Sequence, residues 1–350
     1  MSDVLPTQPP RVDEPVPEAR EVAAGIWKIT LPIPFPLKTV NVYALVGKSG
    51  WALVDAGMGT SDAREAFSAG LKKAGLAVSG LEAIVLTHHH PDHIGLSGEL
   101  QEQSGARVYM HSIDEKSVRI IWDGTMPERF KRVSSFFHQH GLENTNLWYT
   151  QAAQANPRAV RMVINVPPHE AFTLVEDGDF LELAGERYQV FWVPGHSDGQ
   201  ITLLRERDGA FLAADHILPR ISPNVGLYSD FDRQNPLGDY LESLAKVEHL
   251  PVTVVLPGHG EPFPDLAQRV QELILHHADR EEEILGLLKE RPQHAASLTR
   301  QMFPPRRISN HEALRMAVAE VLAHLEHLRL AGQVERKSTE DGIILYHALS

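Results

Sequence analysis

The sequence predicts an α/β fold in which two β-sheets pack together and helices cover their outer faces. Short runs rich in apolar and β-branched residues recur between Gly25 and Leu256, as expected of strands. An amphipathic helical segment, Ser61–Ala74, interrupts the strand series and ends at Gly75. From Asp265 onward the composition changes to helix formers, so we expect a separate C-terminal domain over residues 265–350.

Composition excludes several classes of protein. The 350 residues contain no cysteine, which rules out disulfides and cysteine-based metal or catalytic sites. The net charge of −13 disfavours a general binder of nucleic acid or of anionic membranes. No apolar run approaches the roughly 20 residues that a membrane helix needs. The start of the chain lacks the basic and apolar regions of a signal peptide, so we expect a cytoplasmic protein.

The N-terminal part is expected to hold a flexible arm followed by strands. Residues 1–24 include five prolines and several acids, which predicts an arm without regular structure. Gly25–Thr30 begins the catalytic domain, predicted over residues 25–264, as a strand. The runs 39–46 and 51–55 flank a Gly-bearing turn and predict a hairpin.

A cluster of metal-ligand side chains follows the strand predicted over 81–86. The segment Thr87–His93 reads Thr-His-His-His-Pro-Asp-His. His88 and His90 are two apart in extended chain and point the same way, so they can bind one metal ion. Asp92 and His93, after the turn at Pro91, can face a second ion. Imidazole and carboxylate suit zinc, iron or manganese. The alternative is a solvated polar loop with chance histidines, since the chain has 19.

Three downstream strands each end at one further metal-ligand side chain. The apolar run 191–193 leads to His196, the run 211–214 leads to Asp215, and the run 254–256 leads to His259. Ligand sites of open α/β sheets lie at the carboxyl ends of strands. Seven such groups at strand ends favour a metal site over a polar loop.

This ordered set of motifs resembles the metallo-β-lactamase superfamily from about Gly25 to Pro264. The resemblance implies an αβ/βα sandwich, and it implies that His88, His90 and His196 bind a first metal ion. It likewise implies that Asp92, His93 and His259 bind a second ion, with Asp215 bridging both. Every ligand is present, which argues against an inactive scaffold. His90 argues against the flavodiiron branch of the superfamily, which has Glu at this position. Asp55 is either an ordinary turn residue or, as the resemblance suggests, a support for the site.

Two segments of the predicted catalytic domain are candidates for substrate recognition. Residues 112–165 interrupt the strand series and are rich in aromatic and basic side chains. They predict either a helical insertion with its own small core or a lid over a substrate with an apolar and an anionic part. The loop 216–228 should run past the metals. Its side chains His216, Arg220 and Tyr228 either contact substrate or hold the loop.

The C-terminal domain is predicted to contain three helices and a hairpin. The helices cover 266–289, 295–302 and 311–331, and the hairpin strands cover 334–337 and 343–347. This arrangement resembles the winged-helix tail of the β-lactamase-like protein 2 family. The domain carries 11 Lys and Arg against 13 Asp and Glu, so the cationic footprint of a nucleic-acid binder is absent. We expect it to pack on the catalytic domain, wall the pocket or form a dimer contact.

The resemblance implies a metal-dependent hydrolase acting on a small molecule. We expect two divalent ions, zinc before iron or manganese, whose bound hydroxide attacks an ester-like carbonyl in a thioester, lactone or related small ester. Asp92 and Asp215 are the expected catalytic carboxylates. The alternatives are a phosphodiesterase or nuclease on the same dinuclear site, a mononuclear-iron oxygenase like the persulfide dioxygenases, and a binding protein without catalysis.

Overall fold

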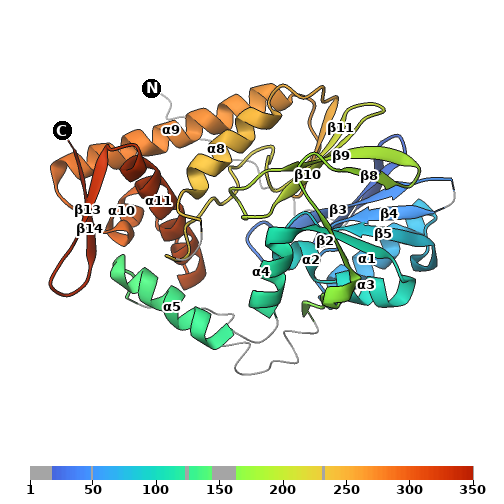
Figure 1. Ribbon diagram of the computed structural model, residues 1–350, viewed down its shortest axis with the longest axis horizontal. Helices are drawn as coiled ribbons and strands as arrows, with labels where there is room; N and C mark the ends of the chain where they lie inside the picture. The colour runs from blue at the N-terminus through green and yellow to red at the C-terminus, as the bar shows by residue number, and fades with distance from the viewer. Residues whose placement is uncertain (1–17, 49, 123–125, 144–162, 231–232, 350) are drawn as a thin grey trace, which may run out of the picture.

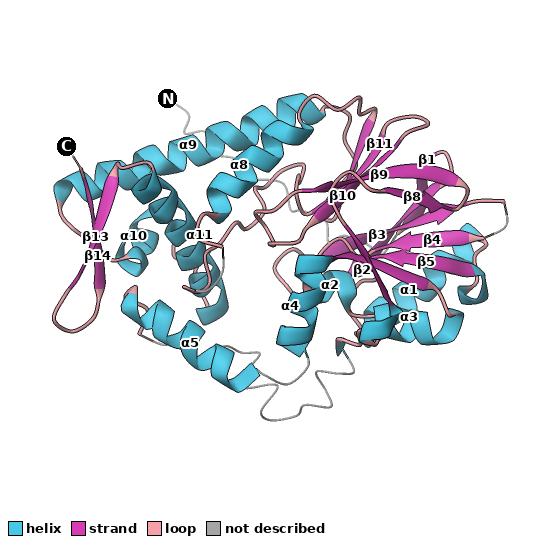
Figure 2. Ribbon diagram, viewed as in Figure 1, coloured by secondary structure: helices cyan, strands magenta, loops and turns pink. Residues whose placement is uncertain are grey.

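The computed structural model describes residues 18–48, 50–122, 126–143, 163–230 and 233–349. Two β-sheets face each other at one end of the molecule, and helices cover them and extend to the C-terminus at the other end (Figures 1 and 2). This arrangement confirms the predicted α/β sandwich.

The first sheet has seven strands, whose order in space follows their order in the chain. Its first four strands pair antiparallel, and its last three join the sheet in parallel. The strands are β1 (Ala19–Ala23), β2 (Ile26–Pro32), β3 (Thr39–Val46), β4 (Trp51–Val54), β5 (Leu81–Val85), β6 (Arg107–His111) and β7 (Phe172–Val175). The predicted hairpin is confirmed as β3 and β4.

The second sheet has five strands in the order β12-β11-β10-β9-β8. Only β11 and β12 pair in parallel, because the chain between them crosses over as a loop and a helix. The strands are β8 (Phe180–Leu183), β9 (Glu186–Trp192), β10 (Ile201–Arg205), β11 (Ala210–Ala214) and β12 (Val254–Pro257).

Apolar side chains fill three layers of core. One lies between the sheets and includes Tyr43, Val54 and Leu212. A second joins the first sheet to α1 (Ser61–Ala74) and α3 (Ser97–Ser104). A third joins the second sheet to α8 (Pro236–Val247) and to the C-terminal helices. Helices therefore cover the outer face of each sheet. The loops at the carboxyl ends of the strands are the part of the sheets that can carry the predicted metal ligands.

The predicted N-terminal arm, residues 1–24, ends too late, because its last residues form a strand. Ala19–Ala23 forms strand β1, which pairs antiparallel with β2 from Ala19↔Ile29 onward. The reason is tertiary: backbone bonds to β2 and burial of Ala19 against the first-sheet core stabilise a short segment next to a proline-rich stretch. The rest of the arm, residues 1–17, lies outside the described residues.

The insertion over 112–165 contains helices, as predicted, in its described part. These are α4 (Ser112–Trp122) and α5 (Met126–Gln139); residues 123–125 and 144–162 lie outside the described residues. Among the residues that the structure describes, α5 belongs to a shared core and not to a separate small one. Its residues Val133, Phe136 and Phe137 belong to the same core as the C-terminal helices.

The C-terminal region matches the predicted order of three helices and a hairpin. It contains α9 (Leu266–Glu290), α10 (Ala295–Met302), α11 (His311–Leu330) and the antiparallel pair β13 (Val334–Ser338) and β14 (Ile344–Ala348). Helix α11 is buried on most of its length and shares its core with the second sheet. Within the described residues, no helix is both long and apolar enough to cross a membrane.

Candidate metal centre

The loop after β5 carries four of the seven predicted ligands. His88 lies three residues after the end of the strand. The short helix α2 (Pro91–Ile94) follows His90 and has Pro91 in its first position. Proline suits that position because its fixed φ matches the helix and its missing N–H is not needed there. The turn carries Asp92 and His93 inward, where both are buried.

The other three ligands come from loops at the ends of β9, β11 and β12. His196 follows Gly195, whose φ of 145° lies in the region that favours glycine. Asp215 follows Ala214, whose φ is 46°. At Gly258, before His259, an added Cβ would lie 2.1 Å from Oδ1 of Asp215. A glycine is therefore required where the last two loops meet.

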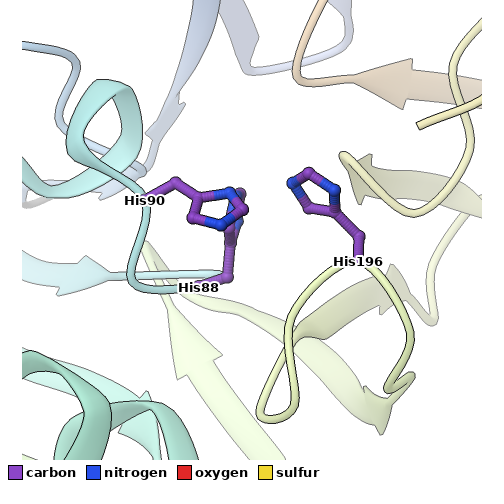
Figure 3. A group of neighbouring side chains, drawn as sticks. All are labelled: His88, His90 and His196. Atoms are coloured by element: carbon purple, nitrogen blue, oxygen red, sulfur yellow. The ribbon is translucent and has the colours of Figure 1, made fainter. Parts of the chain in front are cut away.

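All seven side chains meet at one place, as predicted. Ligand atoms lie within 4.8 Å of one another in each of three overlapping groups: His88, His90 and His196; His88, His93 and Asp215; Asp92, His93 and His259. Figure 3 shows the first group, in which the rings of His88 and His90 come from one loop and His196 faces them from another. The ring centroids of His90 and His196 are 4.5 Å apart.

Asp215 lies between the groups. Its Oδ1 is 3.5 Å from Nε2 of His93, and its Oδ2 is 3.5 Å from Nε2 of His196 and 3.2 Å from Nε2 of His259. Asp92 belongs to the third group, with Oδ2 3.5 Å from Nε2 of His259.

Two of the histidine rings are held by side chains of the first sheet. Nδ1 of His93 donates to Oδ2 of Asp55 at 2.8 Å. The Thr87 hydroxyl donates to Asp55, so it accepts from Nδ1 of His88 at 3.0 Å. The sequence allowed two roles for Asp55, an ordinary turn residue or a support for the site. These hydrogen bonds show that it supports the site.

Two further rings are held by backbone carbonyls. Nδ1 of His196 donates to the carbonyl of Asn224 at 2.8 Å, and Nδ1 of His259 donates to the carbonyl of Thr39 at 2.6 Å. With the proton fixed on Nδ1 in this way, Nε2 presents its lone pair to the centre, which is the usual arrangement of metal-binding histidines.

The pKa shifts of the histidines differ in direction between the two predicted metal positions. Burial lowers the pKa of His88 and His90 well below the usual histidine value, and neighbouring histidines add to this effect. These rings are therefore neutral, as ligands must be. Burial also opposes protonation of His93 and His259, but the carboxylates of Asp215 and its neighbours outweigh it and raise both pKa values. A field that favours a proton there equally favours a metal cation.

The donor set fits divalent metal ions. The Nε2 atoms of His88 and His196 are buried and have no hydrogen-bond partner among the described residues. Leaving a buried polar atom unpaired costs about 1–3 kcal/mol, which coordination would remove. Imidazole and carboxylate ligands suit zinc, iron and manganese alike.

Asp114 is a structural residue of the site that sequence reasoning missed. Its buried carboxylate accepts from the backbone N–H of His89, the hydroxyl of Ser197 and the backbone N–H of Gly199. Burial opposes its ionisation, but the interaction with His89 and these hydrogen bonds outweigh it and lower its pKa. Asp114 ties the His88 loop to the His196 loop. Its place three residues after β6 is the signal that could have found it.

The three proposed substrate contacts lie in different surroundings. His216 is fully buried against the ring of Tyr240, and burial lowers its pKa to about 3. Arg220 is exposed. Tyr228 is half-buried, and its hydroxyl donates to the side chain of Asn224. Contact of any of them with substrate stays a prediction.

Comparison with known families decides what this centre belongs to. Residues 36–259 match the family model described as the metallo-beta-lactamase superfamily, which is more than half of the chain. The chain belongs to the metallo-beta-lactamase superfamily. Residues 282–349 match the metallo-beta-lactamase-like C-terminal domain. The resemblance inferred from the ordered ligand motifs is confirmed.

Relatives of this superfamily member are similar over nearly the whole chain. A probable metallo-hydrolase, YqjP of Bacillus subtilis (strain 168), is 27% identical over 304 residues, covering 86% of this chain and 91% of the relative. A metallo-beta-lactamase family protein from Thermus thermophilus has a TM-score of 0.81 and 37% identity, covering 94% of this chain and 100% of its own. A beta-lactamase domain protein from Burkholderia ambifaria has a TM-score of 0.82 and 31% identity, covering 96% and 97%. Family and ligand set together identify a metal-dependent hydrolase.

Proposed function

We propose that this protein is a dinuclear hydrolase that cleaves an ester-like bond in a thioester, lactone or related small ester, with zinc as the favoured metal. The position of Asp215 carries the proposal. Its two oxygens lie 3.5 Å from Nε2 of His93 and 3.5 Å from Nε2 of His196, which belong to different ligand groups. A carboxylate in that position suits a bridge between two ions.

The chain's own residues would bind, orient and move a proton. His88, His90 and His196 would hold one ion, and Asp92, His93 and His259 the other. Divalent ions, when bound, lower the pKa of a coordinated water and polarise a carbonyl oxygen. Asp92, with a side chain still 13% exposed, would orient the attacking water and pass its proton to the leaving group.

A thioester is the first substrate class to test. A relative from Aspergillus fumigatus, named atrochrysone carboxyl ACP thioesterase, is 24% identical over 132 residues, which is 38% of this chain and 39% of that protein. Thioester carbonyls need no strong acid to release their leaving group, so one carboxylate such as Asp92 is sufficient for the proton transfer.

The test is a substrate panel run on the purified full chain with measured metal content. It contains thioesters, lactones, phosphodiesters, an RNA and β-lactams, together with oxygen uptake in the presence of a thiol substrate. We expect hydrolysis within the thioester and lactone group, and its loss together with the metal in His90→Ala and Asp215→Ala. Cleavage of RNA alone, oxygen uptake alone, or full hydrolysis in metal-free protein would reject the proposal.

A further inference from the structure

One histidine of the metal centre is supported from outside the first sheet. The rings of His88 and His93 are hydrogen-bonded to Thr87 and Asp55, which lie in the loops after β5 and β4. The ring of His259 is hydrogen-bonded to Thr39 at the start of β3. His196 instead donates to the carbonyl of Asn224, in the loop between β11 and α8. The position of the His196 ring therefore depends on what fixes that loop.

The side chain of Asn224 is fixed by helix α11. Its amide Nδ2 donates to the carbonyl of Met316 at 3.3 Å. Its Oδ1 accepts from the hydroxyl of Tyr228. The ring of Tyr228 in turn lies 5.0 Å under the guanidinium of Arg315, which is also on α11. The residue that orients His196 is thus attached to the C-terminal helix on both sides of its amide.

The rest of the loop is held by C-terminal helices as well. The backbone N–H of Leu227 donates to the carbonyl of Ala319 at 3.0 Å. From α9, Arg269 donates through Nε to the carbonyl of Leu218 at 2.7 Å and through Nη2 to the carbonyl of Ile221 at 2.9 Å. Backbone carbonyls held in this way cannot shift without breaking bonds to α9 or α11.

From these contacts we propose that Asn224 is a positioning residue through which the C-terminal domain stabilises the first metal ion. The inference rests on the proposed dinuclear centre. The C-terminal domain then acts on the metal centre itself, although it contributes none of the seven ligands. Partners of ligating histidines typically change metal affinity about 10–100-fold when they are lost.

The experiment measures zinc affinity of the metal-free full chain by competition with a chromophoric chelator, so no substrate is involved. The two binding steps are assigned with His90→Ala and His259→Ala, each of which removes a ligand from one group. Asn224→Ala keeps the backbone carbonyl but removes the side-chain contacts that fix it. We therefore expect it to weaken the step that His90→Ala removes by about 10-fold, the lower end of that range, and to leave the other step nearly unchanged. Tyr228→Phe removes one bond to Asn224 and keeps the ring, so it should produce a smaller loss at the same step.

The matched control is Thr299→Ala. Thr299 is buried in α10 and its hydroxyl bonds only within that helix, to the carbonyl of Ala295. This variant disturbs the C-terminal domain without touching the Asn224 loop. Equal effects of Asn224→Ala and Thr299→Ala on zinc affinity, or an unchanged first step in Asn224→Ala with normal thermal unfolding, would overturn the proposal. If the wild-type chain binds one ion only, the dinuclear premise fails, and the same comparison on that single step decides the role of Asn224.

Discussion

Four of the metal-ligand histidines are each oriented by a second residue. Asp55 is the most connected of these, because its carboxylate accepts from Nδ1 of His93 and from both the N–H and the hydroxyl of Thr87. Thr87 then accepts from His88. One carboxylate thus orients a histidine in each ligand group.

Replacing Asp55 with Asn should weaken metal binding without unfolding the protein. The amide keeps the shape but removes the charge that His93 donates to, so we expect about a 10–100-fold loss of zinc affinity at the second ion. Chelator competition measures it, with the exposed Asp62→Asn on α1 as the control. Affinity equal to that of the control would contradict the role given to Asp55.

Gly258→Ala tests how closely the last two loops must approach. The new Cβ would lie 2.1 Å from Oδ1 of Asp215, so the carboxylate or the backbone has to move. A displacement of about 1 Å in a catalytic site can cost on the order of 100-fold in rate, and we expect at least that loss together with reduced metal content. Gly286→Ala in α9 is the control, because its Cβ would meet no atom within 4 Å. Two variants with the same activity would show that the contact is unimportant.

The sequence predicted the metal ligands themselves but not all of the residues that hold them in place. The seven ligands could be found because they are metal-ligand side chains in the loops that directly follow apolar strands. Asp114 was missed although it lies three residues after β6, because its role is to join two loops that are distant in the sequence. Asn224 could not be found, since it acts through its backbone carbonyl. Every residue has a backbone carbonyl, so the residue type does not show which carbonyl orients a ligand.

Helix α5 of the predicted insertion packs in the same core as helix α11 of the C-terminal region. Phe137 of α5 is completely buried, with its ring 6.4 Å from that of Tyr228 and 5.8 Å from the guanidinium of Arg315. The aromatic residues of segment 112–165 predicted a helical insertion with its own small core or a lid. They could not show that α5 packs on helices about 180 residues away, because composition identifies apolar side chains and not their partners.

Phe137→Ala should therefore destabilise the whole protein and not the insertion alone. Removing a fully buried phenylalanine ring costs about 3–5 kcal/mol. Denaturant unfolding measures the loss, and we expect one transition at lower denaturant. A loss below about 1 kcal/mol would mean that α5 packs loosely on this core. Lys131→Ala, an exposed position on the same helix, is the matched control.

For the whole molecule, the predicted domain boundary near Asp265 does not separate two cores. Phe211 and Val255 of the second sheet share one apolar core with Val318 and Leu322 of α11. The change in composition at that point marked a change from strands to helices. It did not mark a break in packing, which depends on contacts between distant parts of the chain.

This shared core contains neutral histidines that should make stability fall in acid. Burial lowers the pKa of His140 to about 3, of His277 to about 2 and of His324 to about 4. The unfolded chain takes up these protons near pH 6.5, so the stabilisation is complete above that pH and is lost as the pH falls toward the folded-state values. At pH 5 each residue should have lost about 2 kcal/mol relative to neutral pH.

His140→Phe isolates one of these contributions. The ring of His140 stacks on Tyr346, and phenylalanine keeps that contact without the proton. Unfolding of the metal-free chain at pH 7.5 and pH 5 should show a pH-dependent loss smaller by about 2 kcal/mol than in the wild type. His249→Gln, at an exposed position, is the control. Identical pH dependence in His140→Phe and the wild type would show that His140 does not titrate in this way.

The most direct test follows thioester hydrolysis while zinc is titrated into the metal-free full chain. A dinuclear centre should give no hydrolysis without metal, and a rise in rate that reaches its plateau at two ions per chain. Hydrolysis that is already complete in the metal-free chain, or a plateau reached at one ion, would contradict the dinuclear centre assembled around Asp215.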